Sequence, residues 1–428
     1  MSSKAGNPFG KFLLLWSGQL VSAIGSGLSS FGLGVYVYGV TGKASAVALV
    51  TLLAFMPSLL LSAVSGVLAD RYDRRILMVL GDSLSALGVG FILVCMLRGE
   101  VQLWQICLGV AISSVFSSLL EPAYKATVTD LLTPEQYTKA SGLVQVAGSS
   151  KYLISPILAG FLLTVSDIKL LLILDICTFF VTVTSTLVVR SGLISKAGGP
   201  ASSFIGEFKE GWAALTEKKG VLVLVIMASV ITFFLGFIQT LSTPLVLAFS
   251  DSAALGTMET VAASGMLVTS VIVGILPIKK GYVKLLSVSL FFAGLGMAAF
   301  GMRESIVWIC LSGFFFFAMM PFANASLDFL TRTNIENSKQ GRAWGLIGVI
   351  SQLGYVAAYA LAGVLADYVF NPLLADGGAL AGSVGRIIGT GSGRGTGFLI
   401  VVSGGLLCLT AILLYQFKSV QKLEAGGA

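Results

Sequence analysis

Four ionisable side chains interrupt long stretches of sequence that are otherwise almost free of charge. They are Asp82, Glu121, Lys151 and Asp175. Ionisable groups in apolar surroundings are costly and usually face a cavity or a partner, so each is a candidate functional residue. The chain contains no histidine, so a carboxylate is the side chain best suited to bind and release a proton. These residues therefore suggest proton transfer, and no catalytic residue, metal site or cofactor is expected.

Lys151 is the deepest of the four, roughly 18 Å along its predicted helix at ~1.5 Å per residue. Glu121 and Asp175 could each reach it, and the alternative is that Lys151 contacts only water or a ligand. A nearby ammonium favours an ionised carboxylate, whereas desolvation favours the neutral acid. The protonation of such a pair can therefore depend on conformation.

The elements that position these residues are long apolar segments. Of the 428 residues, 56% are hydrophobic and 11% are charged. A spanning helix needs ~20 apolar residues. The composition predicts an all-α membrane protein with twelve transmembrane helices, at approximately 12–38, 45–69, 76–97, 103–125, 141–165, 169–189, 221–249, 255–278, 284–302, 305–329, 343–370 and 395–417. Asp328 and Glu259 fall near the ends of predicted helices, where solvated or interfacial roles are expected.

The connections between these helices differ strongly in their content of lysine and arginine. Most of these residues fall in the loops on the side that also holds both termini. Because basic loops resist translocation, we expect both termini in the cytoplasm of a bacterial inner or plasma membrane. The net charge of +7 follows from this bias and from attraction to anionic lipid, so no nucleic-acid partner is expected.

The longest inner connection divides the chain into two halves. We expect a six-helix bundle at 1–190, a cytoplasmic linker at 191–220 and a second six-helix bundle at 221–428. Within the linker, apolar residues from Phe204 to Leu215 fall near helical spacing. This pattern predicts an amphipathic helix on the membrane surface, although the segment could equally be a simple tether.

One short inner loop has a distinctive sequence. Gly66-Val-Leu-Ala-Asp70-Arg71-Tyr-Asp73-Arg74-Arg75 resembles the signature loop between the second and third helices of major facilitator superfamily transporters. The segments starting at Trp16, Glu121 and Gln340 are similar to those of macrolide-efflux-like drug–proton antiporters. The resemblance implies two six-helix bundles, operation as a monomer, and alternating access that exchanges protons for a small amphipathic organic substrate.

The predicted fifth helix departs from the glycine pattern of these antiporters. Lys151, Ser155 and Ala159 replace three of its glycines, while Gly142, Pro156 and Gly160 are retained. Pro156 can kink the helix and so contribute to gating. Ser26 stands where many relatives of this branch carry an aspartate. This weakens the case for a proton carrier on the first helix.

Glu121 is the leading candidate for the proton carrier. We expect it to bind a proton when its helix faces outside and to release it inside as substrate moves in the opposite direction. Alternatively, Glu121 only caps or braces the inner end of its helix. Asp82 and Asp175 are weaker candidates, for which a structural role is more expected.

The signature loop is best interpreted as a gate. Asp70 can accept charge-assisted bonds that hold the inner side shut, and Gly66, Arg71, Arg74 and Arg75 belong to the same motif. The alternative is that the arginines act only as topology signals.

A polar face on the first helix suggests a substrate path. Gln19, Ser22 and Ser26 share that face, and Ser118 and Glu121 continue the pattern on the fourth helix. The resemblance adds residues from the seventh and tenth helices, which line the cavity in this superfamily: Gln239, Thr243, Met320 and Asn324. The polar stripe could equally hold helices together.

Two other functions remain to be weighed. The chain could be a dedicated carrier of one physiological solute, such as a siderophore, peptide or lysolipid. It could also be a membrane sensor or enzyme on a transporter fold. The sequence carries no phosphate-binding Gly-x-x-x-x-Gly-Lys-[Ser/Thr] motif, which favours ion-driven transport over direct use of ATP.

Overall fold

The computed structural model describes residues 8–190, 204–276, 278 and 280–425. Within these ranges the regular elements are helices, and twelve helical segments are long and apolar enough to cross a membrane. A helix satisfies its own backbone hydrogen bonds, which lipid cannot do. The all-α membrane architecture predicted from composition is therefore confirmed.

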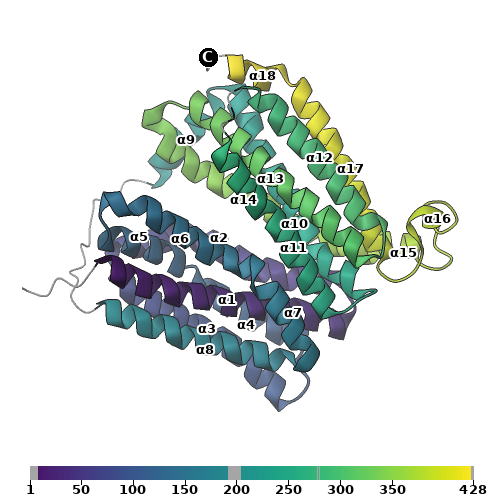
Figure 1. The fold of residues 1–428 in the computed structure, drawn as a ribbon, viewed down its shortest axis with the longest axis horizontal. Helices are drawn as coiled ribbons and strands as arrows, with labels where there is room; N and C mark the ends of the chain where they lie inside the picture. The colour runs from purple at the N-terminus through teal and green to yellow at the C-terminus, as the bar shows by residue number, and fades with distance from the viewer. Residues whose placement is uncertain (1–7, 191–203, 277, 279, 426–428) are drawn as a thin grey trace, which may run out of the picture. The chain divides into compact units, whose positions relative to one another are not determined.

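The chain divides into two compact units, each described by itself. The first unit comprises Met1–Val40 and Leu49–Pro200, and the second comprises Thr41–Ala48 and Ala201–Ala428. The helices of the first half (Figure 1) are α1 (Pro8–Thr41), α2 (Ala44–Arg71), α3 (Arg74–Arg98), α4 (Leu103–Ser117), α5 (Leu120–Leu131), α6 (Tyr137–Leu153), α7 (Ser155–Val165) and α8 (Ile168–Arg190). Short 3₁₀ turns occur at η1 (Pro134–Gln136) and η2 (Asn337–Lys339), and a π-helical segment at η3 (Ala366–Phe370).

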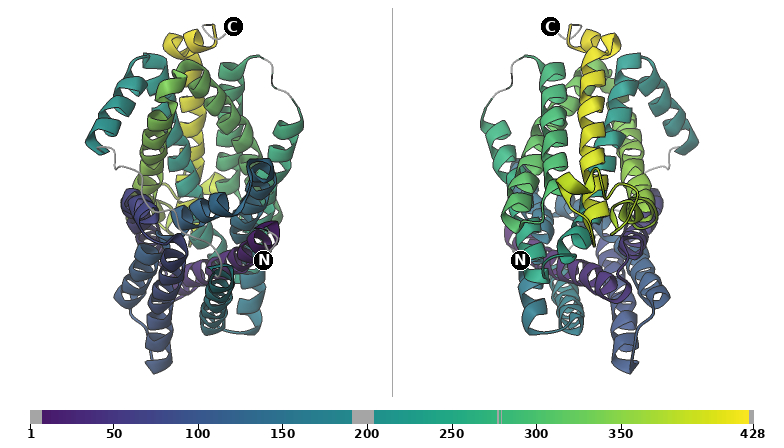
Figure 2. Two further views of the ribbon diagram at one scale, coloured as in Figure 1. Left: turned by 90° about the vertical axis from the view of Figure 1, so that its left-hand side faces the viewer. Right: turned by 90° about the vertical axis from the view of Figure 1, so that its right-hand side faces the viewer.

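The second half begins with α9 (Phe204–Thr216) and α10 (Lys219–Leu247). The remaining elements are α11 (Ser252–Ile275), α12 (Tyr282–Met302), α13 (Ile306–Asn334), α14 (Gln340–Leu365), α15 (Asn371–Leu374), α16 (Gly385–Ile388), α17 (Arg394–Gln416) and α18 (Lys418–Ala425). Figure 2 shows α18 turning away from the end of α17 at the C-terminal end of the chain.

Two of the spans are broken rather than continuous. The span Pro134–Val165 is interrupted at Ile154, and Pro156 lies in the first turn of α7. Proline is tolerated there because the first residues of a helix have no intrahelical acceptor for their N–H groups. The span Leu103–Leu131 breaks after Ser117, just before Glu121 and Pro122.

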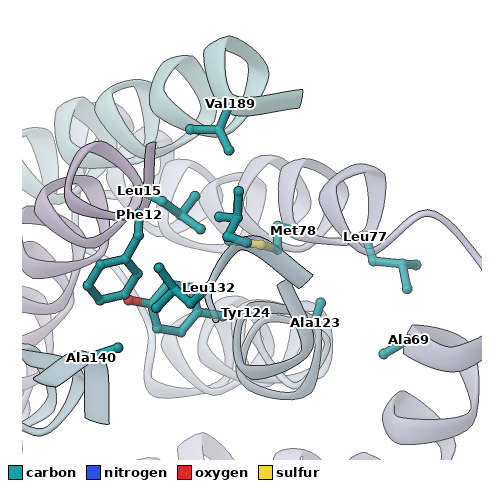
Figure 3. Packing of buried hydrophobic residues seen from close by; sticks show 11 residues of the cluster. Phe12, Leu15, Ala69, Leu77, Met78, Ala123, Tyr124, Leu132, Ala140 and Val189 are labelled. Carbon is teal, nitrogen blue, oxygen red and sulfur yellow. The ribbon is translucent and has the colours of Figure 1, made fainter. Parts of the chain in front are cut away.

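An apolar cluster holds one end of the first unit together (Figure 3). Phe12 and Leu15 from α1 meet Met78 from α3 and Tyr124 from α5. Elsewhere in this unit, a Cβ on Gly88 would lie 2.4 Å from the Gly109 carbonyl oxygen, so α3 and α4 are in backbone contact. Small residues provide such close contacts between membrane helices.

In the second unit, α9 packs against α14 at Gly211, where a Cβ would lie 2.9 Å from the Arg342 carbonyl oxygen, and Ala214 and Leu215 of α9 are buried. Glu210 pairs with Arg342 of α14, and Lys339 lies 3.1 Å from both Glu217 and Glu336. Hydrogen bonds that the Lys339 ammonium donates to Glu217 and then to Glu336 raise the pKa of Lys339. The predicted linker helix is thus present but attached to a bundle helix, with Trp212 exposed. The opening of the linker and the side chains of 204–208 lie outside the description.

Carboxylates from distant parts of the sequence cap two helices. Glu424 of α18 accepts from the backbone N–H groups of Tyr282 at 2.9 Å and Val283 at 3.2 Å, at the start of α12. Asp367 accepts from Ala44 N at 3.0 Å and Ser45 N at 2.8 Å, at the start of α2. A negative charge is favourable at the positive end of a helix. These caps fix how the helix ends pack within the second unit, to which residues 41–48 belong.

We expect Asp367→Ala to lower the free energy of unfolding by about 1 kcal/mol, because two backbone donors lose their acceptor. Thermal unfolding of the purified protein in detergent measures the change. Asp376→Ala, at an exposed position between α15 and α16, is the control. Equal stability of the two variants would contradict the cap.

Candidate functional site

All four ionisable residues belong to the first unit, and three of them act on one another there. Asp82 lies on α3, Lys151 near the end of α6, and Asp175 on α8. Asp82 is 0% exposed and Asp175 is 2% exposed. We call Asp82, Lys151 and Asp175, together with Ser26 of α1, the acidic cluster.

The acidic cluster is held by weak contacts. The Ser26 hydroxyl donates to Asp175 Oδ1 at 3.4 Å, and Lys151 acts on Asp175 electrostatically without a direct ion pair among the described residues. The charge of Asp175 acts in turn on Asp82. Neither carboxylate oxygen of Asp82 has a hydrogen-bond partner in the described part of the chain. A buried ionised carboxylate without partners is strongly disfavoured.

The charges of the acidic cluster do not balance when all three groups are ionised. Two carboxylates then face one ammonium, which leaves a net negative charge in a buried site. Binding of one proton by either carboxylate makes the cluster neutral. Two interacting acids take up such a proton as a pair rather than as independent groups.

Glycines on α1 create this arrangement. A Cβ on Gly25 would lie 2.2 Å from Thr178 Oγ1 and 3.0 Å from Asp175 Oδ1. A Cβ on Gly27 would lie 2.2 Å from Ser155 Oγ, and the Ser155 hydroxyl donates to the Ile24 carbonyl at 3.0 Å. The close approach of α1 to α7 and α8 places Ser26 beside Asp175.

Glu121 lies apart from these contacts. It is exposed in the first turn of α5, and Lys125 Nζ lies 2.6 Å from its Oε1. Of the two partners expected for Lys151, Asp175 is the one whose carboxylate Lys151 acts on. Exposed pairs four residues apart on a helix contribute little stability, so the Glu121 carboxylate is not strongly held.

The signature loop braces the first unit. Arg74 Nη1 lies 2.7 Å from Asp130 Oδ2 and donates to the Ala126 carbonyl at 3.3 Å, linking α3 to α5. Arg75 is buried and Arg71 is exposed, while a Cβ on Gly66 would meet open space. The Asp70 side chain lies outside the description, so its gating role stays a prediction.

The predicted substrate residues of the first unit differ in accessibility. Ser118 is buried, with its hydroxyl 3.1 Å from that of Ser65, and Ser22 is also buried. The amide nitrogen of Gln19 is buried without a partner among the described residues. Gln19 therefore keeps a polar group that packing within the described residues does not satisfy, whereas the Ser26 hydroxyl donates to Asp175.

In the second unit, Gln239 and Asn324 are exposed, whereas Thr243 and Met320 are buried. The Tyr359 hydroxyl of α14 donates to Gln239 Oε1 at 3.2 Å, and the Tyr355 and Tyr359 ring centroids are 5.7 Å apart. Sequence reasoning missed both tyrosines. Their four-residue spacing on an apolar helix was the available signal.

Comparison with known proteins agrees with this architecture. The pattern that defines the Major Facilitator Superfamily matches residues 15–359. The chain belongs to the Major Facilitator Superfamily. It is therefore a multi-pass membrane transporter rather than an enzyme.

Among curated relatives, Macrolide efflux protein A of Streptococcus pyogenes is 31% identical over 228 residues, which cover 52% of this chain and 55% of that protein. The protein of the same name from Enterococcus faecalis is 31% identical over 188 residues, covering 43% and 57%. The chain thus spans a little over half the length of these relatives. Their matches support the predicted resemblance to the macrolide-efflux branch.

Solved structures share the fold at low sequence identity. The nucleoside transporter NupG, in its D323A mutant, superposes with a TM-score of 0.76 at 13% identity, covering 95% of this chain and 100% of that chain. A bacterial homologue of the human lysosomal transporter Spinster gives 0.72 at 14% identity, covering 100% and 99%. These likenesses establish the fold alone.

The glycines that position the acidic cluster can be tested on one helix. We expect Gly25→Val to lower the free energy of unfolding by about 1–3 kcal/mol, because the new side chain overlaps Thr178 and Asp175. Thermal unfolding in detergent provides the measurement. Gly34→Val is the control, since a Cβ at Gly34 meets nothing within 4 Å. If both variants unfold alike, the proposed close approach of α1 is wrong.

Proposed function

We propose that this transporter exports small amphipathic organic compounds in exchange for protons, and that the acidic cluster is its proton site. The observation that carries the proposal is a pair of buried carboxylates that act on each other, with Lys151 acting on Asp175. Neither carboxylate has a permanent ion-pair partner in the described residues, so a proton is the simplest way to neutralise the second acid. Intramembrane acids of this kind are typical of proton relays.

The cluster joins four helices, α1, α3, α6 and α8. A shift of α1 relative to α8 would change the contact of Ser26 with Asp175, and a shift of α6 would change the distance from Lys151 to both acids. Each change alters the balance between ionised and protonated forms. Alternating access can therefore couple proton uptake on one side to release on the other.

The proposed substrate class rests on two observations. Relatives that match about half of this chain are named for macrolide efflux. In the second unit, Gln239 with Tyr355 and Tyr359 combines an amide with aromatic surface. Such a mixture suits an organic molecule with both apolar and polar parts, and we place Gln239, Asn324, Gln19 and Ser26 along its path. Ser22, Ser118, Thr243 and Met320 support the path by packing.

The gate and topology remain part of the proposal. We place Asp70 and Arg71 at the inner gate, with Arg74 and Arg75 bracing it and Gly66 and Pro156 providing flexibility. Both termini lie in the cytoplasm, and the transporter works as a monomer.

Comparison of Asp82→Asn, Asp175→Asn and Glu121→Gln tests the proton site. In liposomes with an imposed pH gradient, we expect both Asp variants to transport an amphipathic fluorescent substrate only at the rate measured without a gradient. In each variant the remaining carboxylate and Lys151 balance each other without a bound proton, so the acidic cluster has no proton to exchange. Glu121→Gln should keep gradient-driven transport, because Glu121 is exposed and paired with Lys125.

The opposite pattern would assign proton transfer to Glu121, whose exposed carboxylate is accessible to water and is the competing carrier. Counterflow without a gradient serves as the folding control, since exchange of substrate for substrate needs no net proton movement. An Asp variant that fails in counterflow as well has lost its fold or substrate path rather than its coupling.

A further inference from the structure

Helix α18 packs against the ends of three other helices of the second unit (Figure 1). A Cβ on Gly220 of α10 would lie 2.4 Å from the Ser419 carbonyl oxygen, and Leu423 is buried at the same contact. At the end of α13, the Asn334 amide donates to the Leu423 carbonyl at 3.1 Å. Glu424 caps the start of α12 by accepting from backbone N–H groups. Helix α18 is therefore held in place by packing, by a hydrogen bond and by a charged cap.

The contact with α10 brings two lysines to one junction. Lys219 directly precedes Gly220, and Lys418 directly precedes Ser419. Because the backbones of Gly220 and Ser419 touch, the two lysines start from neighbouring positions on α10 and α18. Both side chains are exposed.

The cap on α12 forms a second junction of the same kind. Glu424 accepts from the N–H groups of the first two residues of α12, which lie between Lys280 and Lys284 in the chain. Lys422 precedes Glu424 by two residues. We call the exposed lysines at the two junctions, with the adjoining one at the start of α10, the lysine surface. It comprises Lys218, Lys219, Lys280, Lys284, Lys418 and Lys422.

The positive charge of the lysine surface is not balanced by nearby acids. Within residues 218–220, 280–284 and 418–425, Glu424 is the only acid in the sequence, and backbone N–H groups already engage its carboxylate. Lys218 donates to the neutral Asn334 side chain at 3.2 Å, and no ion pair of the six lysines is seen among the described residues. The described acids of the neighbouring α9 and α13 pair with other cations. Such a surplus of one charge attracts a partner of the opposite charge.

Exposed apolar side chains continue from the lysine surface along the spanning helices. On α12, Val288 and Phe292 follow Lys284 at four-residue steps, and both are exposed. Residues four apart share a face of a helix, so Lys284 lies at one end of an apolar stripe. Tyr415 and Phe417 are exposed at the junction of α17 with α18, and aromatic residues favour the level of lipid headgroups. Charge beside apolar surface matches a ligand with an anionic head and acyl chains, whereas a soluble anion would use the charges alone.

We propose that the lysine surface binds the headgroup of an anionic phospholipid, and that Glu424 holds α18 where it completes the site. The phosphate oxygens accept hydrogen bonds from the lysine ammonium groups, while the acyl chains lie along the exposed face of α12. Lysines at a membrane surface each add to the attraction for anionic lipid. The site lies in the second unit, and neither proton exchange at the acidic cluster nor the proposed efflux substrate is needed for it.

Native mass spectrometry of the purified full-length protein tests the proposal. The probes are dioleoylphosphatidylglycerol, which is anionic, and dioleoylphosphatidylcholine, which is zwitterionic and has the same acyl chains. We expect Lys418→Gln combined with Lys422→Gln to weaken binding of the anionic lipid by about tenfold, because two positive charges are lost, and to leave the zwitterionic lipid unaffected. Lys139→Gln combined with Lys209→Gln is the matched control, since it removes two charges from α6 and α9. Equal loss in both double variants, or no loss in the first, overturns the proposal.

Glu424→Ala separates an assembled site from general attraction between charges. Removal of a negative charge would strengthen general attraction of an anionic lipid, whereas loss of the cap frees α18 from α12 and weakens a site that needs both. We therefore expect weaker binding of the anionic lipid, and unchanged or stronger binding contradicts the assembled site. Displacement of the lipid by glycerol phosphate at the same concentration also refutes the proposal, because it assigns the surface to a soluble phosphate compound. Thermal unfolding shows that each variant compared is folded.

Discussion

The apolar interior of the bilayer is the constraint on which the rest of this structure depends. It supplies no hydrogen bonds, so each polar group at that depth needs a partner within the chain or from a ligand. The backbone meets this demand by forming helices. Where the ladder of hydrogen bonds is broken, as at Ile154, the break falls beside a proline, and the Ser155 hydroxyl attaches the new helix to the Ile24 carbonyl. The interruption is thereby fixed in position next to Lys151.

The same lack of hydrogen bonds from the bilayer makes the weak contacts of the acidic cluster significant. Asp82 and Asp175 are more deeply buried than Glu121, yet they have weaker contacts than most surface acids of this protein. A site built only for stability would place a direct ion pair there, because an uncompensated buried charge is strongly destabilising. Lys151 instead acts on Asp175 without a direct ion pair among the described residues, and in our proposal helix movement changes the charge state of the pair. Deep burial with incomplete neutralisation is the combination that a proton-exchanging site requires.

The sequence predicted the fold better than the site. Long apolar runs and the signature loop from Gly66 to Arg75 were sufficient for twelve spans and the superfamily, because hydrophobic length is a local property. The sequence leaves the partner of Lys151 open between Glu121 and Asp175, because that choice depends on how α6 and α8 are rotated about their axes. The contact of Ser26 is a second feature that the sequence did not predict. Where many relatives carry an acid, this chain has a hydroxyl that contacts Asp175 from the neighbouring helix.

Long-range caps could not be read from the sequence at all. Asp73 caps α3 locally, by accepting from Arg75 N at 3.0 Å, and an aspartate just before a helix is a visible signal. At the start of α12 the N-cap position is Gly281, and the carboxylate comes from Glu424 near the end of the chain. Asp367 likewise reaches the start of α2 from a residue more than three hundred positions away.

Many of the described carboxylates have a strong partner within the chain, and a few do not. Asp73, Asp251, Asp367 and Glu424 are held by backbone donors at helix starts, while Asp130, Asp328 and Glu304 are held by arginines. Such acids are permanently neutralised, so they stabilise the structure and gain little from a proton or a ligand. Asp82 and Asp175 lack comparable partners within the described ranges. A transporter needs charges whose compensation can change during the cycle, and it is the incompletely compensated acids, rather than the most exposed ones, that meet this need.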